Sequence, residues 1–162
     1  MASGRVPGDA VSLAEARGAA DFPILLPELD GLGPPDAVHL DRRRPSGGNV
    51  ALIYGVRPGY PADAEGVGLV ITEFRADIGP EVFEKLVHSG VRVDGTSVAG
   101  GPAYWVSGGE HYFFYRDASG RMVEETLRLV GDTLIWESSG LTLRVEGAQS
   151  LDVARRVAAS LR

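Results

Sequence analysis

The chain contains no cysteine, a single lysine and no long apolar run. Without cysteine, disulfides, thiolate chemistry and Cys-ligated metal sites are excluded. No apolar stretch approaches the roughly 18 residues that a membrane helix needs, so we expect no membrane span within the chain. The 22 acidic side chains outnumber the 16 basic ones and give a net charge of −6, which argues against nucleic acid as a partner.

What is present suits one folded domain. The chain has 162 residues, and 44% of them are apolar, which is enough to bury a core. We expect residues 1–10 to form a linker or a disordered tail and residues 11–162 to form a single domain. A helix is predicted after Ser12, which begins a capping box with Glu15, and a second after Ser150, where apolar residues recur every four positions.

Between these helices, short segments of alternating apolar residues are separated by Gly, Pro and Asp. This pattern predicts about eight or nine antiparallel strands joined by successive hairpins. Residues 80–88 interrupt it with an apolar stripe and are expected to form a third helix. The predicted fold is α+β: a curved antiparallel sheet, or half-barrel, with two or three helices, of which the C-terminal one packs on the sheet.

Two segments have an irregular composition. Residues 22–27 are bracketed by prolines and are expected to lie extended at an edge of the sheet. Residues 57–66 are rich in Gly and Pro and are expected to form a loop of the kind that often carries function.

An aromatic zone is predicted in the middle of the sheet. It consists of Tyr104, Trp105, His111, Phe113, Tyr115 and Trp136. These side chains could line a cleft for a lipid or another apolar ligand in the concave face of the sheet, or they could be plain core. Both interpretations stay open, and the six residues are the candidate ligand-binding positions.

No catalytic constellation is visible in the sequence. None of the three histidines is spaced as a metal-binding pair, and a Gly-x-Ser-x-Gly elbow and a Gly-rich phosphate loop are both absent. Glu137 and Glu146 could face each other across a hairpin. A hydrolase that uses a carboxylate such as Glu73 or Glu137 is the weakest hypothesis. We therefore predict no enzyme, no metal and no cofactor.

Several phrases along residues 11–162 share a pattern with other proteins. They include Ser12-Leu13-Ala14-Glu15-Ala16, Gly101-Pro102-Ala103-Tyr104-Trp105-Val106 and Thr133-Leu134-Ile135-Trp136-Glu137. In these phrases the chain resembles an uncharacterised bacterial domain found outside the membrane in anti-sigma-factor-like and lipoprotein-like proteins. That domain is similar to the half-barrels of lipoprotein carriers and of periplasmic sigma regulators.

The resemblance implies both a role and a location. The role is a non-catalytic sensory or interaction domain of a signalling or envelope protein, with a protein partner, and the alternative is carrier-like binding of an apolar or lipid ligand. Such domains usually follow a transmembrane helix or a lipobox, and this chain contains neither. We expect an extracytoplasmic domain that is anchored in the full-length protein, and the alternative location is the cytoplasm.

Overall fold

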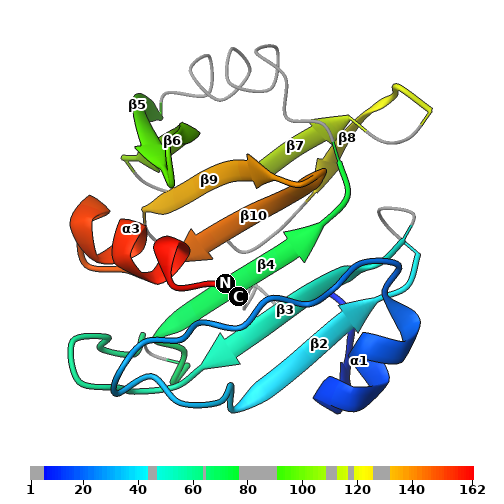
Figure 1. Cartoon of the computed structure of the whole chain (residues 1–162), viewed down its shortest axis with the longest axis horizontal. Helices are drawn as coiled ribbons and strands as arrows, with labels where there is room; N and C mark the ends of the chain where they lie inside the picture. Colours follow the sequence, from blue (N-terminus) through cyan, green and yellow to red (C-terminus); the bar gives the residue numbers. More distant parts are fainter. Residues whose placement is uncertain are drawn as a thin grey trace.

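The computed structural model describes residues 6–43, 47–63, 65–76, 91–108, 113–116, 119–125 and 132–162. Its main element is an open antiparallel sheet of eight strands in the order β1-β2-β3-β4-β10-β9-β6-β5 (Figure 1). These strands are β1 (Asp9–Val11), β2 (Ala37–Asp41), β3 (Asn49–Tyr54), β4 (Leu69–Phe74), β5 (Arg92–Val98), β6 (Gly101–Ser107), β9 (Thr133–Ser138) and β10 (Leu141–Glu146). A separate two-stranded sheet consists of β7 (Phe113–Arg116) and β8 (Met122–Glu125).

Two helices occur in the described part of the chain, α1 (Leu13–Ala19) and α3 (Leu151–Ala159). Each begins at its predicted cap, because the hydroxyl oxygens of Ser12 and Ser150 each accept a hydrogen bond from the backbone N–H three residues later. α3 packs on β9 and β10 (Figure 1). The predicted α+β class, with the C-terminal helix on an antiparallel sheet, is therefore confirmed. The helix predicted at 80–88 lies outside the described residues.

The strand pairing departs from a run of successive hairpins. β5 and β6 form one hairpin and β9 and β10 another, but β6 pairs with β9, and the β7–β8 hairpin forms a sheet of its own. The predicted run of successive hairpins is thus wrong for the described strands, because β6 does not pair with β7 and β8 does not pair with β9. The physical reason is side-chain matching: the β6–β9 register places Trp105 beside Leu134 and Ala103 beside Trp136, all on the buried face.

The sheet begins earlier in the chain than the sequence predicted. β1 pairs with β2 from Asp9 onward, so residues 9 and 10, which we assigned to a linker, belong to the sheet. The backbone of Gly8 lies against Leu40, and a Cβ at position 8 would lie 2.5 Å from the carbonyl carbon of Leu40. A glycine therefore allows the N-terminal segment to approach β2 closely.

Residues 22–27 cover the face of the sheet and do not form an edge strand. The backbone N–H of Leu25 donates to Oε2 of Glu73 on β4 at 3.0 Å. Leu26 exchanges two backbone hydrogen bonds with Arg162, of 2.9 and 3.0 Å. The expected edge position is wrong because Phe22 and Ile24 are apolar enough to be buried against the sheet, where they are 5% and 7% exposed.

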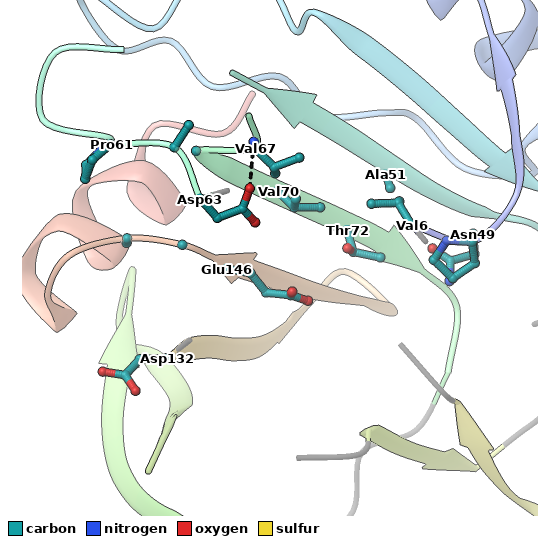
Figure 2. Close-up of a pocket in the computed structure, with 15 residues that line it drawn as sticks. Val6, Asn49, Ala51, Pro61, Asp63, Val67, Val70, Thr72, Asp132 and Glu146 are labelled. Atoms are coloured by element: carbon teal, nitrogen blue, oxygen red, sulfur yellow. Dashed lines mark hydrogen bonds between the residues drawn. The ribbon is translucent and has the colours of Figure 1, made fainter. Parts of the chain in front are cut away.

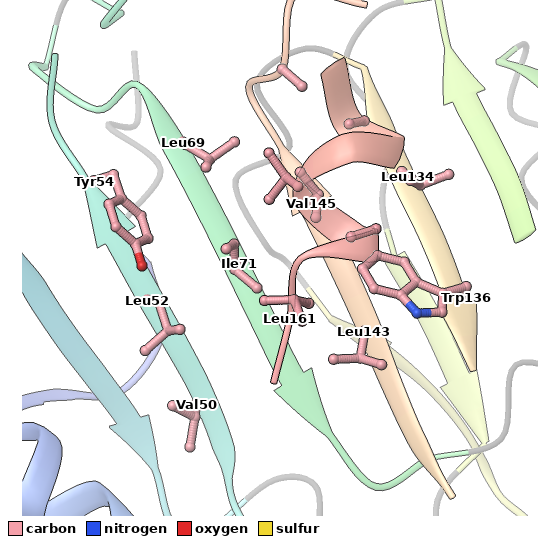
Figure 3. Packing of buried hydrophobic residues seen from close by; sticks show 14 of the residues in the cluster. Val50, Leu52, Tyr54, Leu69, Ile71, Leu134, Trp136, Leu143, Val145 and Leu161 are labelled. Atoms are coloured by element: carbon pink, nitrogen blue, oxygen red, sulfur yellow. The ribbon is translucent and has the colours of Figure 1, made fainter. Parts of the chain in front are cut away.

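The two faces of the sheet differ in chemistry. One face packs against α3 and residues 22–32 and forms the hydrophobic core (Figure 3). Its strand residues include Val50, Leu52, Tyr54, Leu69, Ile71, Leu134, Trp136, Leu143 and Val145. The alternate positions face the other way and include buried polar side chains, among them Asn49, Thr72, Thr142, Arg144 and Glu146. The polar face contains the candidate site.

Candidate functional site

A pocket of about 390 Å³ opens on the sheet face opposite α3 (Figure 2). Its floor consists of Asn49 and Ala51 from β3 and of Val70 and Thr72 from β4. These residues alternate with the core residues of the same strands, so their side chains point away from α3. The volume falls within the roughly 300–1,000 Å³ that small-molecule sites usually have.

The walls of the pocket come from segments that are distant in the sequence. They are formed by Val6 and Pro7, by Pro61, Ala62, Asp63, Val67 and Gly68 of one loop, by Asp132 and by Glu146 to Ala148 at the end of β10. The loop predicted at 57–66 as a functional type thus contributes Pro61, Ala62 and Asp63 to the wall. The walls and floor are mainly apolar, with a few polar side chains among them.

Asp63 fixes the shape of the loop wall. Its Oδ1 accepts hydrogen bonds from the backbone N–H groups of Glu65 and Val67, at 2.9 and 3.0 Å, and its own N–H donates to the carbonyl oxygen of Val67 at 2.8 Å. An aspartate side chain that closes a turn in this way organises the backbone locally. The carboxylate also lines the cavity, so one residue both shapes the wall and presents charge to the pocket (Figure 2).

Two glycines allow close backbone approaches at the loop wall. Gly147 has a φ of +88°, and a Cβ at this position would clash with the carbonyl oxygen of Gly68. A Cβ on Gly68 would lie 2.6 Å from the carbonyl oxygen of Gly55. Side chains at these positions would force the backbone segments apart, so the pocket depends on glycine at both.

Polar groups lie on the floor and at one end of the pocket. Thr72 is 4% exposed and lies on the pocket floor. Glu146 is 7% exposed and forms an ion pair with the guanidinium of Arg144, which is fully buried and neighbours Thr72 in the β4–β10 register. A buried charge needs such a partner because desolvation is costly.

The described members of the aromatic zone do not line this pocket. Trp105 and Trp136 are 8% and 4% exposed and belong to the hydrophobic core. Figure 3 shows Trp136 among the packed core residues. For these two residues the structure matches the plain-core interpretation. Tyr104 alternates with Trp105 on β6, so it faces away from the core and is half-buried.

The structure does not describe the side chains of the remaining candidates of the aromatic zone. Phe113 and Tyr115 lie in β7 of the separate small sheet, at positions whose side chains are not among those described. His111 lies outside the described residues. The prediction of a ligand-binding role for these three residues stays a prediction.

The carboxylates considered for catalysis are not brought together. In the β9–β10 register, Glu137 lies opposite Thr142, and Glu146 lies opposite Thr133, so the expectation that the two glutamates face each other is wrong. Glu137 is exposed at the strand end, whereas Glu73 is fully buried on the core face, away from the pocket. Desolvation raises the pKa of Glu73 to about 8, and the hydrogen bond from Leu25 opposes this shift.

The sequence contained a signal for the pocket that we did not use. Small or polar residues, Asn49, Ala51 and Thr72, alternate with large apolar ones on β3 and β4. Small side chains on one face of two paired strands leave space that large ones would fill. Which segments surround that space depends on how the chain folds over the sheet, and the strand pattern does not contain this information.

The fold and pocket define an open-sheet α+β domain with one face packed by a helix and the other hollowed. Within the described ranges, no group of three or more His, Asp or Glu residues could hold a metal ion. No described helix has the length and apolar character needed to cross a membrane. No family model, curated protein or solved structure matches this chain.

Proposed function

We propose that the chain is a non-catalytic binding domain, and that the pocket on the polar face of the sheet takes a small ligand with an apolar body. The observation that carries this proposal is the pocket itself: a cavity of about 390 Å³ with apolar walls and a few polar side chains. This combination is typical of sites that bind small molecules. The ligand would make the domain a sensor, or the sensing part of an interaction domain.

The geometry supports a polar-face site better than the aromatic cleft that the sequence predicted. A carrier-like site among Trp105 and Trp136 would need a cavity on the core face, where both rings are buried in the hydrophobic core. The polar-face pocket supports the same ligand class, an apolar molecule, at a different place. Carrier-like binding of a lipid or other apolar ligand is therefore retained as an alternative use of the pocket.

We also propose that the domain lies outside the cytoplasm. It would belong to a signalling or envelope protein and bind a protein partner. The support for this setting is the resemblance of residues 11–162 to extracytoplasmic domains. A protease-accessibility assay on intact cells that produce the full-length gene product tests this setting. Cleavage of the domain from outside would support it, and protection until the cells are lysed would contradict it.

Binding is tested with 1-N-phenylnaphthylamine, whose fluorescence rises in an apolar site. We expect saturable binding with one site per chain. Ala51→Leu places a larger side chain on the pocket floor and should weaken binding at least about tenfold, because the added methyl groups occupy the cavity. The matched control is Ala14→Leu on the exposed surface of α1, which should bind as the unaltered protein does. Equal binding by both variants, or no saturable binding, would contradict the proposal.

A further inference from the structure

The N-terminal segment forms one wall of the pocket and also leads into an edge strand of the sheet. Val6 and Pro7 line the cavity, and β1 begins two residues after Pro7. Figure 2 shows Val6 near Asn49, at the end of the pocket opposite Pro61. A ligand that touches this wall therefore acts directly on the chain that enters β1.

The loop wall and the β10 wall are anchored in the interior of the protein. Tyr60, next to the wall residue Pro61, is 8% exposed, belongs to the hydrophobic core and exchanges two backbone hydrogen bonds with Arg57, of 2.9 and 3.2 Å. The guanidinium of Arg57 donates in turn to the carbonyl oxygen of Leu32 at 2.9 Å. At the end of β10, Ala148 is 7% exposed and also belongs to the core. The floor comes from β3 and β4, each paired on both sides, so these parts of the pocket are fixed by the fold.

The N-terminal wall is held less firmly. β1 has three residues and lies at the edge of the described sheet, where it pairs with β2. Within β1, Val11 packs against the core, while Asp9 and Ala10 are exposed. The carbonyl oxygen of Val6 lies 3.3 Å from Nδ1 of His39 on β2. Short segments with few buried contacts open locally at a low free-energy cost, so this wall is the part of the pocket that moves most easily.

The strand registers connect β1 to the pocket floor. Ala10, His39, Ala51 and Thr72 lie opposite one another in turn on β1, β2, β3 and β4. Side chains directly opposite each other in paired strands project from the same face of a sheet, and Ala51 and Thr72 line the cavity. β1 therefore extends the face that contains the pocket, and separation of β1 from β2 removes the N-terminal wall of the cavity.

We propose that ligand binding is coupled to the docking of residues 6–11, the N-terminal lid, on β2. A ligand contacts Val6 and Pro7 only while β1 is paired with β2, so it stabilises the paired state. Linkage requires the reverse as well: a change that separates β1 from β2 weakens binding. This inference rests on the proposed binding function and names its regulation, because occupancy of the pocket is transmitted to the edge of the sheet.

Amide hydrogen exchange of the whole chain, followed by mass spectrometry, tests the coupling in one direction. At a free 1-N-phenylnaphthylamine concentration of about ten dissociation constants, we expect exchange in β1 to become at least about threefold slower. Exchange in the β5–β6 hairpin, which does not line the pocket, should stay the same. Ala51→Leu fills part of the cavity and should show less slowing in β1 at the same dye concentration.

Gly8→Ala tests the reverse direction. Gly8 has a φ of +93°, and a Cβ at this position would lie 2.5 Å from the carbonyl carbon of Leu40, so alanine forces the lid away from β2. We expect the affinity for the dye to fall at least about threefold and exchange in β1 to become faster. The matched control is Gly31→Ala, which also has a positive φ, of +83°, but has nothing within 4 Å of the added Cβ. It should leave binding and exchange in β1 unchanged, and circular dichroism melts show whether both variants are folded.

The outcomes separate the inference from the proposed function. If the dye binds saturably and exchange in β1 does not change, the coupling is wrong while the pocket function stands. Equal slowing of β1 in Ala51→Leu would show that the dye acts outside the pocket, which overturns the inference. The inference is also overturned if folded Gly8→Ala binds the dye as the unaltered protein does, or if Gly31→Ala weakens binding as much. If the dye does not bind saturably, the proposed function fails and the coupling fails with it.

Discussion

Glu73 is a carboxyl group in a hydrophobic core, between Val50 and Leu143 in the sheet register. It is fully buried, Oε2 accepts one hydrogen bond from Leu25, and Oε1 has no hydrogen-bond partner among the described residues. The core disfavours its charged form, so the pKa in the folded protein rises to about 8, while an unfolded chain has an ordinary glutamate. Ionisation of Glu73 therefore opposes folding.

The pH dependence of stability follows from this shift. The stabilising effect of a protonated Glu73 is complete below the ordinary glutamate pKa, near pH 4.5, and is lost as the pH rises through about 8. Glu73→Gln can keep the hydrogen bond from Leu25 and cannot ionise. We expect the free energy of unfolding of the unaltered protein to fall relative to the variant by roughly 2–4 kcal/mol between pH 5 and pH 8. Urea unfolding at both pH values measures this difference, and parallel pH profiles would show that Glu73 does not titrate as described.

At the scale of elements, two hairpins of the main sheet turn through residues with positive φ. Ala99 and Gly100 connect β5 to β6 with φ values of 49° and 82°, and Ser139 and Gly140 connect β9 to β10 with values of 52° and 76°. Two consecutive residues of positive φ are typical of the type I′ turn, whose twist matches that of paired strands. Glycine adopts this conformation easily, whereas alanine does so at a cost.

Ala99→Asn should therefore stabilise the β5–β6 hairpin. Asparagine tolerates positive φ, and Asn-Gly is the favoured pair for this turn, so we expect a gain of about 0.5–1 kcal/mol in the free energy of unfolding. Ala99 is exposed, so no core contact changes. Thermal and urea unfolding check the gain. Gly100→Ala should act in the opposite direction, and a loss of stability in Ala99→Asn would contradict the assignment of the turn.

At the scale of the whole molecule, residues 160–162 form backbone hydrogen bonds to the segment that covers Glu73. Arg162 exchanges two backbone hydrogen bonds with Leu26, and the N–H of Glu28 donates to the carbonyl oxygen of Ser160 at 3.0 Å. Leu161 is 8% exposed and belongs to the core (Figure 3). These contacts join positions more than 130 residues apart, so they depend on the folded arrangement of the sheet and α3.

Removal of residues 160–162 should release this covering segment. Loss of the buried Leu161 side chain and of the backbone pairing is expected to lower the free energy of unfolding by about 2–4 kcal/mol. Amide hydrogen exchange should become faster at Leu26 and Glu28. Arg162→Ala, which keeps the backbone pairing and Leu161, is the control and should change exchange little. Unchanged protection in the truncated chain would show that the C-terminal pairing does not hold the segment.

Local sequence patterns predicted most elements of the fold but not which elements lie next to one another. The caps at Ser12 and Ser150 and the alternation in β3 and β4 act over a few residues, so they can be read directly from the sequence. The β6–β9 pair and the position of residues 22–27 depend on which apolar surfaces match over long separations. A local pattern contains no such information, and for this reason the run of hairpins and the edge position were wrong.

The sequence by itself determined the absence of cysteine chemistry, the acidic charge, the strand-rich α+β class and the two helix caps, because each depends on composition or on neighbouring residues. Only the tertiary structure decided that Trp105 and Trp136 are core, that Glu73 is buried, and that Thr72, Asp63 and Glu146 share one pocket. These three pocket residues come from β4, a loop and β10. These residues come together because of the strand order and because Gly68 and Gly147 approach closely. Neither feature can be predicted from the spacing of residues along the chain.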